Sequence, residues 1–192
     1  MYFIFIFLNL DTNLTIMNID LSKLTELPNN YFEGCFELTS IIIPNTITKI
    51  GNNCFEHCVC LKNVEFENEA LLKELPYKCF YECCSLKKII IPNSIEKIND
   101  YAFGYCTNLQ SIELSNSLKT LGECSFVNCY NLKLIELPKS VKNIGEYCFM
   151  NCFELSRIQF NNHHLKEHIF NECDSNEFDN LFLKCINLKF GL

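Results

Sequence analysis

The chain has 192 residues, of which 48% are hydrophobic, and this is enough to bury the core of a domain. It carries 23 acidic and 16 basic residues, for a formal net charge of −7, and it has no long run of lysine or arginine. This balance argues against a nucleic-acid backbone or an anionic membrane surface as the partner, because both attract cationic proteins.

The first ten residues, MYFIFIFLNL, are the most apolar stretch of the sequence. They are too few for a membrane-spanning helix, which requires roughly 20 residues. They contain no lysine or arginine and no small-residue cleavage site, so they lack the features of a secretory signal. The alternation of Phe and Ile favours a buried strand, and we assign residues 1–13 to an N-terminal strand or cap. A cleaved signal is the alternative.

The pattern L-x-x-φ-x-φ, in which φ is an apolar residue, then recurs along the chain. It begins at Leu38, Leu61, Leu86, Leu109, Leu132 and Leu155, at steps of 23, 25, 23, 23 and 23 residues, and a looser copy begins at Leu14. The two φ residues lie two positions apart and therefore face the same side of a strand. Each copy predicts a strand, and the period predicts that these strands stack in parallel about 4.8 Å apart.

The second half of each unit places a Cys three residues after a Phe. This pair occurs at Phe32 and Cys35, Phe55 and Cys58, Phe80 and Cys83, Phe103 and Cys106, Phe126 and Cys129, Phe149 and Cys152, and Phe170 and Cys173. One unit of this size cannot bury its apolar residues alone, so we expect each Phe to pack on its counterpart in the next unit. The repeats therefore predict a curved solenoid.

Two strings contain both halves of the unit, IPNSIEKINDYAFGYCTNLQSIEL from Ile91 and LPKSVKNIGEYCFMNCFELSRIQF from Leu137. They resemble the BspA-type leucine-rich repeat, and the resemblance extends over about residues 14–160. It implies a leucine-rich repeat solenoid of about 23 residues per repeat, with a parallel β-sheet on one face and short helical or irregular return segments on the other. It also implies protein recognition or surface adhesion, without catalysis. Two extra residues around Glu69–Leu72 depart from the family pattern.

We expect a single domain over residues 1–192, with about seven repeats in 14–173 and a terminal segment in 174–192. The terminal segment has two interpretations. Asp174 and Glu177 can cap a closing amphipathic helix, and alternatively Phe182, Cys185 and Leu188 keep the spacing of a collapsed eighth repeat. Both interpretations place Phe182 in the interior.

The 14 cysteines have a structural interpretation and two chemical ones. Eight of them follow a Phe by three residues, and we expect these to be buried, reduced thiols that act as small apolar residues. Disulfides between neighbouring units are the alternative, because stacked units can approach the Cα separation of roughly 4.4–6.8 Å that a bridge requires. Pairs such as Cys54 and Cys58 have a spacing found in zinc sites, but a column places them one repeat apart and zinc needs four converging ligands.

Catalysis has little support in the sequence. His164 and His168 lie four residues apart and near Cys173, a spacing that suits a metal site or a nucleophile, but no third partner is positioned beside them. No glycine-rich phosphate loop occurs among the six glycines. We therefore expect no enzymatic activity, no cofactor and no metal site.

The binding surface is expected on the sheet. If the two φ residues face inward, the residue between them faces solvent, and down the stack this position reads Ile42, Glu65, Ile90, Glu113, Glu136 and Gln159. A basic column, three residues earlier, contains Lys62, Lys87 and Lys133. Mixed charges beside exposed apolar side chains can orient a partner. We predict a ligand-binding set of Lys62, Glu65, Lys87, Ile90, Glu113, Lys133, Glu136 and Arg157.

The expected partner is a protein, such as a host or matrix protein, and we expect neither nucleic acid nor a membrane span. A structural or scaffolding segment of an intracellular assembly is the alternative function, and ordinary solvated decoration is the alternative interpretation of the sheet. The family resemblance favours the cell surface. Free cysteines and the lack of a clear signal peptide favour the cytoplasm, so the compartment stays open.

Overall fold

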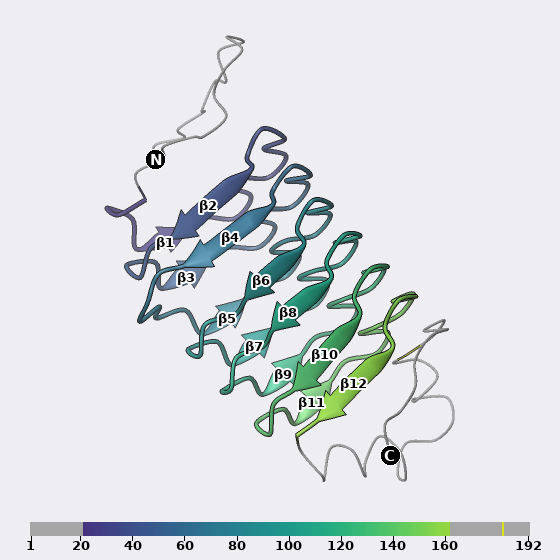
Figure 1. Ribbon diagram of the computed structural model, residues 1–192. Helices are drawn as coiled ribbons and strands as arrows, with labels where there is room; N and C mark the ends of the chain where they lie inside the picture. Colours follow the sequence, from purple (N-terminus) through teal and green to yellow (C-terminus); the bar gives the residue numbers. More distant parts are fainter. Residues whose placement is uncertain (1–20, 162–181, 183–192) are drawn as a thin grey trace.

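Two rows of parallel strands run along the stack in the computed structural model, which describes residues 21–161 and Phe182 (Figure 1). The first row consists of β2 (Ser40–Ile43), β4 (Asn63–Phe66), β6 (Lys88–Ile90), β8 (Ser111–Glu113), β10 (Leu134–Leu137) and β12 (Arg157–Phe160). The second row consists of the two-residue strands β1 (Glu26–Leu27), β3 (Lys49–Ile50), β5 (Glu74–Leu75), β7 (Lys97–Ile98), β9 (Thr120–Leu121) and β11 (Asn143–Ile144). Each turn of this solenoid contributes one strand to each row.

The first row confirms the strands predicted from the L-x-x-φ-x-φ pattern. Ile89 pairs with Ile112, so equivalent residues of successive units lie opposite each other. Both side chains are buried, whereas the residues that follow them, Ile90 and Glu113, are exposed. Pro44 follows β2 directly, where a residue without an N–H group ends the ladder.

Each return segment contains a short strand of the second row, which was not expected from the sequence. The irregular segment that leads from this strand to the next strand of the first row is called an arc below. Residues 21–161 contain no helix. Each arc holds two residues with positive φ four positions apart, such as Tyr101 (φ 57°) and Tyr105 (φ 59°), and a left-handed residue cannot continue a right-handed helix. Alternate N–H groups instead donate to the next turn at 2.8–2.9 Å, namely those of Tyr101, Phe103 and Tyr105 to the carbonyls of Glu123, Ser125 and Val127.

A column of phenylalanine rings fills the centre of the arcs, as predicted. The rings of Phe32, Phe55, Phe80, Phe103, Phe126 and Phe149 are fully buried. Neighbouring rings are stacked nearly parallel, with centroids 5.1–5.6 Å apart. Each turn therefore buries its largest apolar side chain against the equivalent side chain of its neighbours.

Phe182 continues this column beyond the last described turn. Its ring stacks on Phe149 with a centroid distance of 5.7 Å and is buried, which confirms the prediction that Phe182 faces inward. The repeat spacing predicts that Phe170 stacks on Phe149, but in the structure Phe182 stacks there. The predicted closing helix, the eighth repeat and Phe170 itself lie outside the described residues.

Buried thiols accompany the ring column. The Sγ atoms of Cys58, Cys83, Cys106, Cys129 and Cys152 each donate to the carbonyl of the Phe in the preceding turn, at 3.1–3.3 Å. No disulfide joins two cysteines within residues 21–161. Burial raises the pKa of the Cys58 thiol to about 12 and also raises the pKa of the Cys106 thiol.

Both strand rows are interrupted at one place. β2 and β4 form one sheet, and β6, β8, β10 and β12 form another, with no pairing between β4 and β6. The second row divides in the same way between β3 and β5. The interruption coincides with the step of 25 residues between Leu61 and Leu86, whose two extra residues lie between β4 and β5.

Replacing Phe103 with alanine should lower the free energy of unfolding by about 3–5 kcal/mol, because the variant loses a buried ring that stacks on both neighbours. Denaturant unfolding followed by circular dichroism measures this loss. Lys97→Ala, at an exposed position of β7 in the same turn, is the matched control and should change stability by less than about 0.5 kcal/mol. Equal effects of the two substitutions would contradict the stacking of the rings.

Iodoacetamide at about pH 8 should alkylate Cys60 and Cys84 in the folded chain well before Cys58 and Cys106. The first two thiols are partly exposed, whereas the other two are buried and have raised pKa values, so little reactive thiolate is present. Peptide mass spectrometry after timed alkylation measures the order. In denaturant without reductant all four should react, and a thiol that still failed to react would be in a disulfide.

Candidate functional site

The outward-facing side chains of the first strand row form the candidate site, which we call the sheet face. All eight predicted residues are exposed: Lys62, Glu65, Lys87, Ile90, Glu113, Lys133, Glu136 and Arg157. The third residue of each strand, such as Glu65 in β4 or Glu136 in β10, faces solvent between two inward-facing positions. The stacking of the turns therefore brings Glu65, Ile90, Glu113 and Glu136 onto one surface.

The predicted basic column lies beside the strands, not on them. Lys62, Lys87 and Lys133 each precede a strand by one residue, at the starts of β4, β6 and β10. Between this column and the acidic residues lies a row made of the first residue of each strand. These residues are Ser40, Asn63, Lys88, Ser111, Leu134 and Arg157. Of the eight predicted residues, only Arg157 belongs to this row.

Lys88 is a residue of the sheet face that the sequence analysis missed. Its Nζ lies 2.7 Å from Oε1 of Glu113, so the ion pair links β6 to β8. Both side chains are more than half exposed, and an ion pair of this kind contributes only about 0–1 kcal/mol to stability. The signal was present in the sequence, because Lys88 lies two residues before Ile90 and so faces the same side of the strand.

Exposed apolar side chains lie among these charges. Ile42 and Ile90 are 57% and 54% exposed, and Leu134, which was not predicted, is 37% exposed. Large apolar side chains with this exposure cost free energy in water, since each leaves apolar surface hydrated. Their occurrence on a face that also carries fixed charges is a common feature of protein-recognition surfaces.

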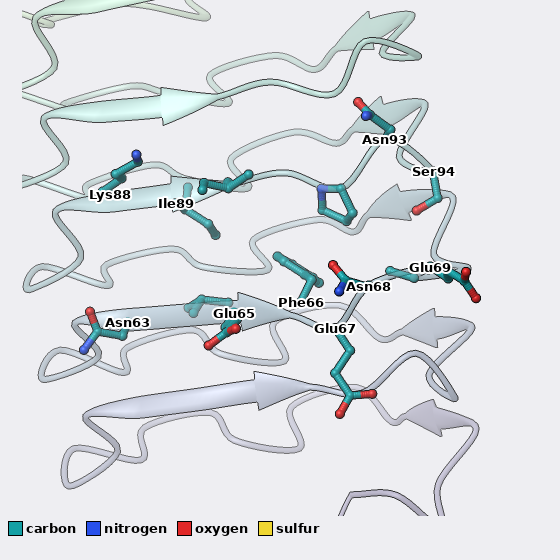
Figure 2. A pocket seen from close by; sticks show the side chains of 14 residues that line it. Asn63, Glu65, Phe66, Glu67, Asn68, Glu69, Lys88, Ile89, Asn93 and Ser94 are labelled. Carbon is teal, nitrogen blue, oxygen red and sulfur yellow. The ribbon is translucent and has the colours of Figure 1, made fainter.

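An open groove of about 810 Å³ lies where β4 and β6 part (Figure 2). Its apolar lining comes from Val64, Phe66, Ala70, Ile89, Ile90 and Pro92. Its charged lining is Glu65, Glu67, Glu69 and Lys88. One oxygen of Glu67 accepts a hydrogen bond from the backbone N–H of Asn45, at 3.1 Å, so this carboxylate is directed toward the preceding turn (Figure 2).

The described part of the chain offers no arrangement of side chains for metal chemistry. Within residues 21–161 and Phe182, no group of three or more His, Cys, Asp or Glu side chains could hold a metal ion. His57 lies on an arc, away from the sheet face, with Nδ1 3.0 Å from the Glu82 carboxylate. His164, His168 and Cys173 lie outside the described residues. The same described residues include no helix of the length and apolarity that a membrane crossing requires.

The repeating unit and the strand stack match a known family. The sequence contains six copies of the BspA type leucine rich repeat region, over residues 5–72 and 73–189. The chain belongs to this family. BspA-type repeats, like other leucine-rich repeats, are generally non-catalytic and are used for protein interaction. No curated protein matches the chain.

Solved structures of bacterial repeat proteins share the fold of this BspA-type chain. A leucine-rich cell surface protein from Faecalibacterium prausnitzii is 26% identical with a TM-score of 0.55, and the match covers 72% of this chain and 43% of that one. The leucine-rich repeat protein of T. pallidum is also 26% identical with a TM-score of 0.55, over 86% of this chain and 61% of that one. The pneumococcal vaccine antigen PcpA, at 23% identity and a TM-score of 0.50, covers 74% and 44% and shows the fold alone. This chain thus spans less than two thirds of each of these proteins.

Reversing two charges of the sheet face, Glu113→Lys with Glu136→Lys, should lower the free energy of unfolding by no more than about 1–2 kcal/mol. Both carboxylates are exposed, and the loss comes from one surface ion pair and from new repulsion with Lys88. Thermal unfolding of the purified variant measures this. Loss of the cooperative transition would show that these residues have a role in folding.

Proposed function

We propose that this BspA-type chain is a protein-recognition module that binds its partner through the sheet face. The observation that carries the proposal is the combination of exposed Ile42, Ile90 and Leu134 with a charged row on strands held by the solenoid. A surface fixed in this way loses little conformational entropy on binding. The charges orient the partner, and the apolar side chains supply most of the binding energy by leaving water.

The partner we propose is a protein at a cell surface or in a matrix, and the role is adhesion. The similarity to a protein described as a cell surface protein, at 26% identity, supports this proposal. A partner with apolar residues between charges of both signs would complement the sheet face. The residues we assign to the contact are Lys62, Glu65, Lys87, Ile90, Glu113, Lys133, Glu136 and Arg157.

A scaffolding role inside the cell is the second candidate, and the free thiols favour it. No disulfide joins any two of the 12 cysteines that the structure describes, and reduced thiols are typical of a reducing compartment. Surface biotinylation of intact cells that produce the protein separates the candidates. Labelling of the protein on intact cells would support adhesion, and labelling only after lysis would support the intracellular role.

The sheet face is tested by measuring binding to a panel of purified cell-surface and matrix proteins. For any panel protein that binds the parent chain, Glu113→Lys with Glu136→Lys should raise Kd about tenfold or more, because the charges at the contact are inverted. The matched control is Glu123→Lys with Glu146→Lys, which reverses two exposed carboxylates on the arcs and should leave Kd nearly unchanged. Equal loss in both variants, or loss in neither, would exclude the sheet face as the site.

A further inference from the structure

The groove between β4 and β6 is the one place in the described chain where adjacent turns part on the sheet side. The ring column continues across it, since Phe55 and Phe80 stack with centroids 5.1 Å apart. Arc hydrogen bonds cross it as well, from the Phe55 N–H to the Cys79 carbonyl at 2.9 Å. The two extra residues therefore open the sheet side without separating the turns in the core.

The shape of the groove suits an extended chain. Its lining follows all of β4 and continues through residues 67–70, and on the other side it runs from Lys88 to Ser94. On the β4 side the lining consists of the four strand residues, which correspond to roughly 13 Å of extended backbone, followed by the turn at residues 68–69. The volume of about 810 Å³ lies in the range of clefts that enclose ligands.

The charges of the groove favour a cationic occupant. Of the three carboxylates that line it, that of Glu67 is directed toward Asn45 of the preceding turn, which leaves those of Glu65 and Glu69. The ammonium group of Lys88 in the lining is already paired with Glu113 at 2.7 Å. Figure 2 shows Phe66 and Asn68 between Glu65 and Glu69, so that an apolar ring lies between two carboxylates. Lysine or arginine residues on either side of a large apolar residue would complement this order.

Glu69 has a left-handed backbone conformation at a place where the other turns have none. Of the described residues with positive φ, all except Glu69 fall into pairs, one pair in each arc; Glu69 (φ 60°) stands alone, in the segment with the extra residues. A glutamate in the left-handed region costs about 1 kcal/mol or more relative to glycine, which adopts it freely. The carboxylate of Glu69 therefore lies on a turn that borders the groove, where it can take part in binding.

We propose that this groove binds an extended segment of a partner protein in which an apolar residue is flanked by lysine or arginine. The proposal rests on the proposed function and deepens it, since the groove would be the anchor of the sheet face. Apolar lining from Phe66 and Ile90 receives the central side chain, and Glu65 and Glu69 pair with the flanking cations. A neutral glycan is the competing occupant, since Asn63, Asn68, Asn93 and Ser94 also line the groove.

The test uses the full chain and a positional-scanning array of nonapeptides, with a glycan array in parallel. We expect the chain to select lysine or arginine at two positions that flank a large apolar residue. For the best peptide, Glu65→Lys with Glu69→Lys should raise Kd about tenfold or more, and the effect should weaken at high salt. Glu123→Lys with Glu146→Lys is the control and should leave Kd within about twofold.

Substituting Glu69 alone separates binding from folding. Glu69→Gly should raise Tm, because glycine adopts the left-handed conformation without strain, and it should weaken peptide binding at the same time. A variant that gained stability and bound the peptide as tightly as the parent would overturn the role of Glu69. Selection of no basic motif, selection of acidic peptides, or binding to the glycan array alone would overturn the proposal.

Failure of this proposal is distinguishable from failure of the proposed function. If a partner protein loses affinity on reversal of Glu113 and Glu136 but not of Glu65 and Glu69, the sheet face stands and the groove does not. If reversal of Glu65 and Glu69 alone abolishes peptide and partner binding, the groove stands and the rest of the sheet face does not contribute.

Discussion

Backbone hydrogen bonds between successive turns are the constraint on which the rest of the structure depends. They recur at the same place from turn to turn, except at Pro76, which has no N–H to donate; for example, the N–H of Gly122 donates to Ile98 and that of Gly145 donates to Leu121, both at 2.8 Å. The turns are so close there that a Cβ at Gly122 would lie 2.5 Å from the backbone nitrogen of Asp100. Because the turns lie this close together and in the same alignment, an inward side chain packs against the equivalent side chain of the next turn. This explains why the sequence repeats the same Phe, Cys and aliphatic residues.

The parts of the fold that follow from this constraint could be predicted from the sequence. The Phe residues and the inward residues of the first row recur at a fixed period, and their large side chains leave a clear pattern. The second row left no such pattern, because a two-residue strand such as Lys97–Ile98 is too short to show alternation. The left-handed positions of the arcs were also hidden, since several carry residues other than Gly and Asn, such as Lys78 and Tyr101.

The candidate site was predictable in its location and less so in its detail. The alternation of a strand is enough to place Glu113 and Ile90 on the outer face. The start of each strand is harder to fix from sequence, so Lys88, the first residue of β6, was not among the predicted residues. The repeat period gives the neighbouring strands and their register, but the ion pair of Lys88 with Glu113 also depends on the side-chain conformations, which only the structure gives.

The two extra residues show how the solenoid can vary without losing its stability. The sequence located them, but it did not show whether the arc or the sheet would absorb them. In the structure the ring column and the arc hydrogen bonds pass from Phe55 to Phe80 unbroken, while β4 and β6 lose their pairing. The stacked rings of Phe55 and Phe80 stay fully buried, so parting the two strands costs a few ladder hydrogen bonds, each worth about 1 kcal/mol net. The arcs thus hold the turns together, and the sheet side is free to acquire charges, exposed apolar residues and a groove.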